Sequence, residues 1–139
     1  MRDIEKEIKI VYRKYGTTNP YELADAMGVE VHRMELGSTR GLFYHSHRIK
    51  QIALNERLSE WMEKFVLAHE LGHLVMHPKH NAPFLATTFF SKDRYEMEAN
   101  AFALHLLISD DEIKEYPDRT LYDWASITGL PVWLVELRF

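Results

Sequence analysis

The segment between Ser59 and Pro78 constrains the fold of this chain more than any other. Ser59 suits the N-cap position of a helix and Pro78 cannot continue one, so the sequence predicts a helix over residues 59–77. Its apolar side chains lie on nearly every side: Trp61, Phe65, Leu67, Ala68, Leu71, Leu74 and Val75. A helix that is apolar all round is stable only when other elements cover it. We therefore expect residues 59–77 to form a central helix.

The rest of the chain is long enough to provide that cover. Its 139 residues fall within the range of roughly 100–200 residues that one hydrophobic core usually supports. The sequence is 46% hydrophobic and 27% charged, as in ordinary globular proteins. We expect a single domain over residues 1–139.

Short helices and a small sheet are predicted before the central helix. Apolar residues at helical spacing over residues 3–15, followed by the helix-start signal Asn19-Pro20, predict N-terminal helices in residues 1–28. Segments rich in β-branched or alternating residues then predict a small antiparallel sheet of three strands in residues 29–55, with strands over 29–36, 41–45 and 49–54.

A second long helix and a helical tail are predicted after the central helix. Asp93 and Glu96 have the spacing of a capping box, so they predict the start of a helix over residues 93–108. Residues 78–92 show no periodicity and are predicted to form a loop, and shorter helical patterns give a helical tail over residues 110–139. We therefore expect an α+β fold in which the sheet packs on the central helix.

Residues His69-Glu70-Leu71-Gly72-His73 place the pattern H-E-x-x-H inside the central helix. Residues four apart on a helix have Cβ atoms about 5–6 Å apart, so the imidazoles of His69 and His73 can bind one metal ion. Glu70 is rotated about 100° from His69, which places its carboxylate beside the ion as a general base. A surface helix with incidental His and Glu residues is the alternative, but the apolar flanks argue against it.

A catalytic zinc ion usually takes three protein ligands and keeps one position open. The chain has no cysteine, so the third ligand must be another histidine or a carboxylate. The helix over residues 93–108 offers Glu96 and Glu98. Glu96 already has a role as the capping partner of Asp93, whereas Glu98 has apolar neighbours. We therefore expect His69, His73 and Glu98 to bind Zn²⁺, with Glu96 as the alternative to Glu98.

Two segments of the chain resemble the ImmA/IrrE family of metallopeptidases. The resemblance rests on residues 68–77 and on Glu96-Met97-Glu98-Ala99-Asn100-Ala101-Phe102-Ala103, and it extends over most of the chain. It implies a small zincin-like (minimal gluzincin) fold in which His69, His73 and Glu98 hold zinc and Glu70 is the catalytic acid/base. It also implies a protein substrate, namely a helix-turn-helix repressor of a phage or another mobile element.

Several side chains are candidates for stabilising the transition state of peptide hydrolysis. His105 is the preferred one, because it lies two helical turns after Glu98 on the same face. We expect His77 to act as a favourable cation near the C-terminal end of the central helix. The alternatives to His105 are Tyr44, His45, Tyr95 and His77.

Charge and composition limit the partners and the location. The chain has 17 basic and 21 acidic residues and a net charge of −4, which argues against a surface built to neutralise nucleic-acid phosphates. The N-terminal residues are densely charged, and no apolar run reaches the length of a membrane span. We therefore expect a cytoplasmic protein that binds no membrane.

The helical tail invites a second interpretation. Residues 121–135 show the Ala, Gly and Val spacing of many helix-turn-helix units, but after Gly129 the only basic residue is Arg138. We therefore expect no direct contact with nucleic acid. The tail is expected instead to pack on the core or to dock substrate through an exposed patch of Trp124, Trp133 and Phe139.

Two functions of different classes remain open. The first is a zinc endopeptidase that acts on a protein partner. The second is a regulatory protein of the same fold that acts by binding alone and keeps only a metal site. Glu70 favours the enzyme, because a binding module has no need for a carboxylate beside the ion.

Overall fold

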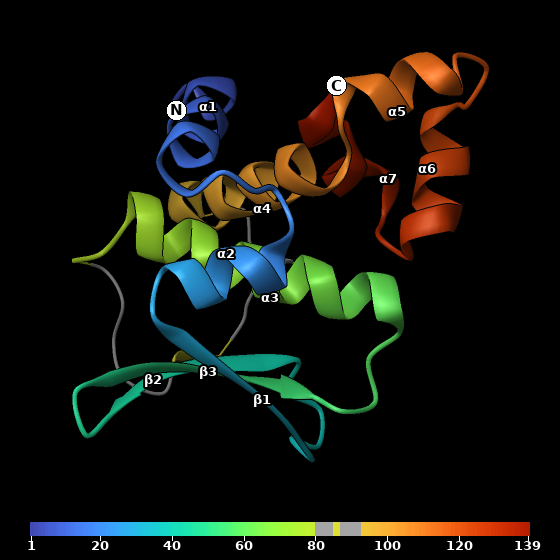
Figure 1. The fold of residues 1–139 in the computed structure, drawn as a ribbon. Helices are drawn as coiled ribbons and strands as arrows, with labels where there is room; N and C mark the ends of the chain where they lie inside the picture. The colour runs from blue at the N-terminus through green and yellow to red at the C-terminus, as the bar shows by residue number, and fades with distance from the viewer. Residues whose placement is uncertain (80–84, 87–92) are drawn as a thin grey trace.

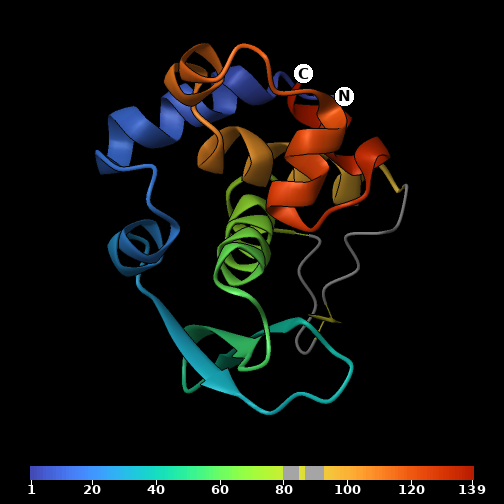
Figure 2. The same ribbon diagram turned by 90° about the vertical axis from the view of Figure 1, so that its right-hand side faces the viewer.

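The computed structural model describes residues 1–79, 85–86 and 93–139 and has an α+β fold. Helix α3 (Glu60–Met76) crosses over the sheet, and helix α4 (Arg94–Leu107) covers α3 from the other side (Figure 1). The view turned by 90° shows α3 between the sheet and α4 (Figure 2). The predicted α+β class and central helix are confirmed. Most of the loop predicted over residues 78–92 lies outside the described residues.

The two N-terminal helices begin and end at their sequence signals. Helix α1 (Ile4–Tyr15) ends at Gly16, whose φ of 73° is the left-handed conformation that terminates many helices. Helix α2 (Pro20–Ala26) begins after Asn19, whose side chain accepts hydrogen bonds from two backbone N–H groups of the first turn. Helix α1 packs on α4, and α2 packs on α3.

The sheet is mixed, with the strand order β1-β3-β2-β4. Strand β1 (Val29–Met34) runs parallel to β3 (Ile49–Asn55), while β2 (Gly41–Ser46) is antiparallel to β3 and the short β4 (Leu85–Ala86) is antiparallel to β2. The prediction of an antiparallel sheet is therefore wrong for β1. The cause is the hairpin of β2 and β3, which inserts the later strand, β3, between β1 and β2.

A tight turn determines the register of that hairpin. Ser46 pairs with Ile49, so only His47 and Arg48 lie in the turn, with φ angles of 53° and 66°. Two-residue turns with positive φ at both positions match the right-handed twist of antiparallel strands. The resulting pairing sets Phe43 opposite Ile52, and both side chains are buried in the core beneath α3.

Helix α3 is buried on all sides in its middle part. It begins after Ser59, whose side chain accepts a hydrogen bond from the backbone N–H of Met62. Every residue from Phe65 to His73 is buried. Neighbouring elements therefore cover the whole circumference of the helix, as its apolar pattern predicts. In the part of the chain that the structure describes, no helix combines the length and apolar character needed to cross a membrane.

A glycine allows α4 to approach α3 closely. A Cβ atom at Gly72 would lie 2.9 Å from Phe102 Cδ1 and 3.2 Å from Phe102 Cβ. A side chain at position 72 would therefore displace the buried Phe102 ring or separate the helices. The close packing brings polar side chains of α4 within reach of the histidines of α3.

The tail consists of helices α5 (Asp110–Glu115), α6 (Leu121–Thr128) and α7 (Val132–Val135) and the 3₁₀ turn η1 (Glu136–Arg138). Trp124 is buried, whereas Phe139 is exposed. The predicted exposed patch of Trp124, Trp133 and Phe139 is therefore wrong for Trp124, whose ring packs into the core.

Candidate metal centre

Helix α3 presents His69 and His73 side by side in its buried half. Their ring centroids are 4.8 Å apart and their planes are inclined by 83°. Both side chains are buried. The two imidazoles therefore adjoin, as their spacing of one helical turn predicts.

Glu96 of α4 brings a carboxylate to these two rings. Its Oε2 atom lies 3.1 Å from His69 Nε2, and its Oε1 atom lies 2.7 Å from His73 Nε2. One ligand atom from each of the three residues lies within 4.8 Å of the other two. We call His69, His73 and Glu96 the inner cluster.

The inner cluster fits a divalent metal ion. Ligand atoms about 2.0–2.1 Å from a tetrahedral ion lie roughly 3.3 Å from each other. The Glu96 oxygens lie 3.1 and 2.7 Å from the two Nε2 atoms, and the three ligand atoms lie within 4.8 Å of one another. His73 Nε2 is buried and makes no hydrogen bond of normal geometry within the described part of the chain, although Glu96 Oε1 is 2.7 Å away. A lone pair in this position is better satisfied by a cation than by a carboxylate.

The charge state of Glu96 also suits a metal ligand. Burial alone would raise the pKa of the Glu96 carboxyl, but the imidazoles of His69 and His73 lower it well below its usual range. Glu96 is therefore ionised at neutral pH and supplies the negative charge that a buried cation requires.

The structure groups Glu96, rather than the predicted Glu98, with the two histidines. Residues two apart on a helix point in directions about 200° apart, so Glu96 and Glu98 lie on nearly opposite sides of α4. The sequence argument against Glu96 is that it pairs with Asp93 in a capping box. In the structure the Asp93 side chain accepts a hydrogen bond from the backbone N–H of Tyr95, and the Glu96 carboxylate points to the histidines. Glu98 instead contacts His77.

Asn100, which the sequence analysis did not single out, holds the first imidazole. Its Oδ1 atom lies 2.7 Å from His69 Nδ1, and both side chains are fully buried. Since a carbonyl oxygen only accepts, His69 Nδ1–H is the donor, and in the neutral ring Nε2, which faces Glu96, is the atom that can bind an ion. The signal in the sequence is that Asn100 follows Glu96 by four residues, one turn along α4.

Carboxylates surround the same imidazole. Burial alone would lower the pKa of His69, but Glu96, Glu70 and Asn100 together raise it. Glu70 follows His69 directly in α3, and its negative charge favours the protonated form of the His69 ring. Glu70 is almost completely buried. A carboxylate beside the cluster, outside the set of ligands, has the position of a general base.

A second group of polar side chains adjoins His73. His77 Nδ1 lies 3.0 Å from His73 Nδ1, and His77 Nε2 lies 2.8 Å from Glu98 Oε1. The backbone N–H of Arg2 donates to Glu98 Oε2 at 2.7 Å. We call His77, Glu98 and Arg2 the outer chain.

His77 is the C-cap residue of α3, but it is not the charged cap that the sequence suggests. Burial lowers the pKa of His77 even though the neighbouring Glu98 opposes that change. The ring contacts His73 on one side and Glu98 on the other. Tyr95, another candidate for stabilising the transition state, packs against His77, with the two ring centroids 4.7 Å apart.

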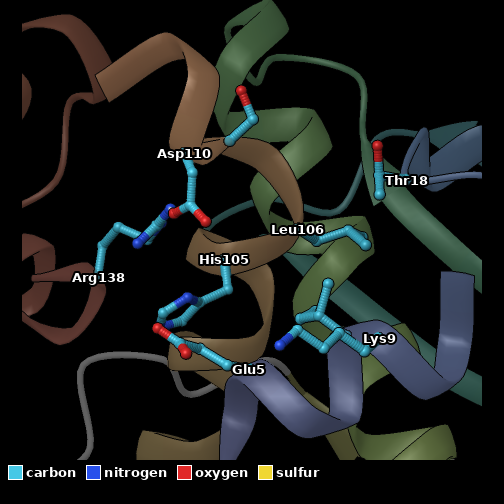
Figure 3. Close-up of a pocket in the computed structure, with 9 residues that line it drawn as sticks. Glu5, Lys9, Thr18, His105, Leu106, Asp110 and Arg138 are labelled. Carbon is cyan, nitrogen blue, oxygen red and sulfur yellow. The ribbon is translucent and has the colours of Figure 1, made fainter. Parts of the chain in front are cut away.

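His105 lies away from the inner cluster, so its predicted role beside the metal is not supported. It is nine residues after Glu96, a distance of about 13 Å along the helix. Its side chain lines a pocket with Glu5, Asp110 and Arg138. Figure 3 shows the imidazole beside Glu5, with Arg138 turned toward Asp110.

Comparison with known proteins identifies the family. The model of the Peptidase_M78 family, described as the IrrE N-terminal-like domain, matches residues 24–138. The chain belongs to this family. The matched residues include α3 and α4, and therefore all three members of the inner cluster.

The chain is also similar to two curated proteins. "Metallopeptidase ImmA" of Bacillus subtilis (strain 168) is 32% identical over 117 residues, which cover 82% of this chain and 68% of that protein. "Uncharacterized immunity region protein 2" of Bacillus phage phi105 is 38% identical over 139 residues, covering 97% of this chain and 88% of the phage protein. The resemblance to the ImmA/IrrE family is confirmed, and a metallopeptidase family implies a bound metal ion.

Proposed function

We propose that the protein is a zinc-dependent endopeptidase that hydrolyses a peptide bond in a specific protein partner. The observation that carries the proposal is the inner cluster of His69, His73 and Glu96 with Glu70 buried next to it. Two imidazoles and one carboxylate are the ligand set of many catalytic zinc sites, and they leave one coordination position open. Membership of a metallopeptidase family supports the same reaction.

The residues of the chain divide the work of hydrolysis. A zinc ion held by the inner cluster would supply Lewis acidity and would make a neighbouring water molecule more acidic. Glu70 accepts a proton from the attacking water and later donates a proton to the leaving amine. His69 and Asn100 keep the geometry rigid, because the hydrogen bond between them fixes the ring plane.

The proposed substrate is a helix-turn-helix repressor of a phage or another mobile element. The name of the phage relative, an immunity region protein, supports a role in phage regulation. A protease that acts in the cytoplasm, where we propose this one works, must spare most proteins. We therefore propose that the isolated enzyme has low activity on generic substrates.

The variant Glu70→Gln tests catalysis separately from metal binding. The amide has nearly the same shape but cannot accept the proton, so peptide hydrolysis should fall by about 10²–10⁴-fold. Zinc content, measured by elemental analysis, should stay at the wild-type level. His69→Ala is the matched control and should lose both the metal and the activity. If Glu70→Gln keeps full biological function, the regulatory module that acts by binding alone is the better description.

The substrate is tested with purified repressors. The protein should cleave a helix-turn-helix repressor encoded next to it at one defined bond, which mass spectrometry of the fragments would locate. Casein serves as the generic control. Rapid degradation of casein by the isolated protein would contradict the proposed specificity.

A further inference from the structure

The outer chain connects the backbone of Arg2 to the proposed metal ligand His73 through two side chains, Glu98 and His77. The contacts run from Arg2 N to Glu98 Oε2 at 2.7 Å, from Glu98 Oε1 to His77 Nε2 at 2.8 Å, and from His77 Nδ1 to His73 Nδ1 at 3.0 Å. Each contact has the length of a normal hydrogen bond. The side chains of His73, His77 and Glu98 are all buried, so solvent does not compete for these groups.

The direction of each hydrogen bond follows from the metal site outward. If His73 binds metal through Nε2, the only proton of its neutral ring is on Nδ1. That Nδ1–H must then donate to His77 Nδ1, which has to be the acceptor. The proton of His77 is therefore on Nε2, where it donates to the Glu98 carboxylate. No other assignment of protons satisfies all three contacts while leaving the His73 lone pair on the metal side.

We propose that His77 and Glu98 are positioning residues for zinc, and that they hold His73 in the one tautomer that can bind the ion. The proposal rests on the metal site put forward above. Without His77, the buried Nδ1–H of His73 would have no acceptor. The tautomer of His73 with its proton on Nε2, the atom that faces the metal site, would then become comparably stable. The Glu98 carboxylate can only accept hydrogen bonds, so it holds the proton of His77 on Nε2 and leaves His77 Nδ1 as an acceptor for His73.

The same arrangement gives a role to the segment before α1. The Arg2 side chain also donates to the backbone oxygen of Met76 at 2.6 Å, so this segment is attached both to Glu98 and to the end of α3. Arg2 lies outside residues 24–138, which match the family model. The support of His73 in this chain therefore includes a contact that the matched region does not contain.

A pair of substitutions at position 77 tests the proposal. His77→Phe removes the acceptor and should lower zinc affinity by about 10–100-fold, the usual effect of losing an outer partner of a ligand. His77→Asn keeps an oxygen acceptor near the place of Nδ1 and should recover most of that loss. Affinity is measured by competition with a chromophoric chelator, and the visible spectrum of the Co²⁺ form reports the ligand geometry. Thermal unfolding of the metal-free proteins separates these effects from general stability.

A second pair isolates the backbone contact. Arg2→Pro deletes the N–H that donates to Glu98, while Arg2→Ala keeps it and removes only the guanidinium. Arg2→Pro should weaken zinc binding more than Arg2→Ala does. Equal affinities for the two variants would overturn the part of the proposal that concerns Arg2.

The outcomes distinguish this proposal from the proposed function. If His69→Ala abolishes zinc binding but His77→Phe binds as tightly as the wild type, the positioning role is overturned and the metal site stands. If the wild type binds no better than His69→Ala, the metal site itself is wrong, and the tautomer argument is overturned with it. Nitrogen NMR of the wild-type histidine rings needs no variant: a proton on Nδ1 of His77 would contradict the proposal, and a proton on Nε2 would support it.

Discussion

The two ends of α4 carry polar residues in similar sequence settings but face different surroundings. Near its start, Glu96 and Asn100 reach the histidines of α3. Near its end, His105 meets Glu5 of α1 and Arg138 of the tail. Both ends have charged or polar side chains one or two turns apart among apolar neighbours. What separates them is the element that packs against each end.

The comparison shows that spacing along one helix identifies a candidate but does not show what it faces. His105 shares a face of α4 with Glu98, as its spacing predicts, but neither residue belongs to the inner cluster. Glu98 contacts His77, and His105 lines a pocket with Glu5 and Arg138. Glu96 and Asn100 share the face that meets α3. Effects on zinc binding should therefore decrease along α4 from Glu96 to His105.

The largest effect is expected at Glu96. Glu96→Gln replaces a charged ligand by a weak neutral one and should reduce zinc affinity by more than about 100-fold, beyond the 10–100-fold that outer partners usually contribute. Glu98→Gln, the matched control two residues away, should stay within that smaller range. Chelator competition measures both. The opposite order, with tight binding kept by Glu96→Gln and lost by Glu98→Gln, would restore Glu98 as the third ligand.

The next largest effect is expected at Asn100, one turn further along. Asn100→Ala leaves the buried Nδ1–H of His69 without its acceptor and should lower zinc affinity by about 10–100-fold. Asn100→Asp keeps an acceptor of the same size and should bind zinc at least as well as the alanine variant does. If the Asn100→Ala and Asn100→Asp variants bind zinc equally tightly, the hydrogen bond from His69 to residue 100 does not contribute to zinc affinity.

Much of this site can be predicted from the sequence, because local rules determine it. The helix starts at Asn19 and Ser59 and the adjacency of His69 and His73 all depend on residues within a few positions of each other. These features appear in the structure as predicted.

The rest depends on how separate elements pack, which local spacing does not encode. The choice between Glu96 and Glu98 depends on the rotation of α4 about its own axis. That rotation is set by contacts such as the one between Gly72 and Phe102. The parallel pairing of β1 depends in the same way on where the hairpin docks. The capping-box spacing of Asp93 and Glu96 favours Glu98 as the third ligand. In the structure the Glu96 carboxylate contacts the histidines of α3 instead of capping the helix.

A smaller effect is expected midway along α4, at the contact of the two helices. Gly72→Ala places a Cβ atom 2.9 Å from Phe102 Cδ1. Alanine would favour the helix by about 1 kcal/mol, but overpacking a core usually costs about 1–3 kcal/mol. We expect a net loss of up to about 2 kcal/mol in the free energy of unfolding, measured with denaturant on metal-free protein, and a modest loss of zinc affinity.

The companion variant Phe102→Leu makes room for the new methyl group. The double variant Gly72→Ala/Phe102→Leu should lose less free energy of unfolding than the sum of the losses in the two single variants. Simple additivity would mean that the close approach of α3 and α4 does not depend on this contact.

The smallest effect on the metal is expected at His105, at the far end of α4. His105→Ala should leave zinc affinity and peptidase activity unchanged and should cost about 1 kcal/mol or less in stability. Burial lowers the pKa of His105, and the nearby Arg138 adds to that effect. The unfolded chain therefore binds a proton more readily than the folded one, so the wild type loses stability as the pH falls below about 6.5. The variant should lose less stability over the same range, which denaturant titrations at several pH values would measure. If His105→Ala instead loses peptidase activity while it binds zinc normally, His105 contributes to catalysis, as the sequence analysis predicts.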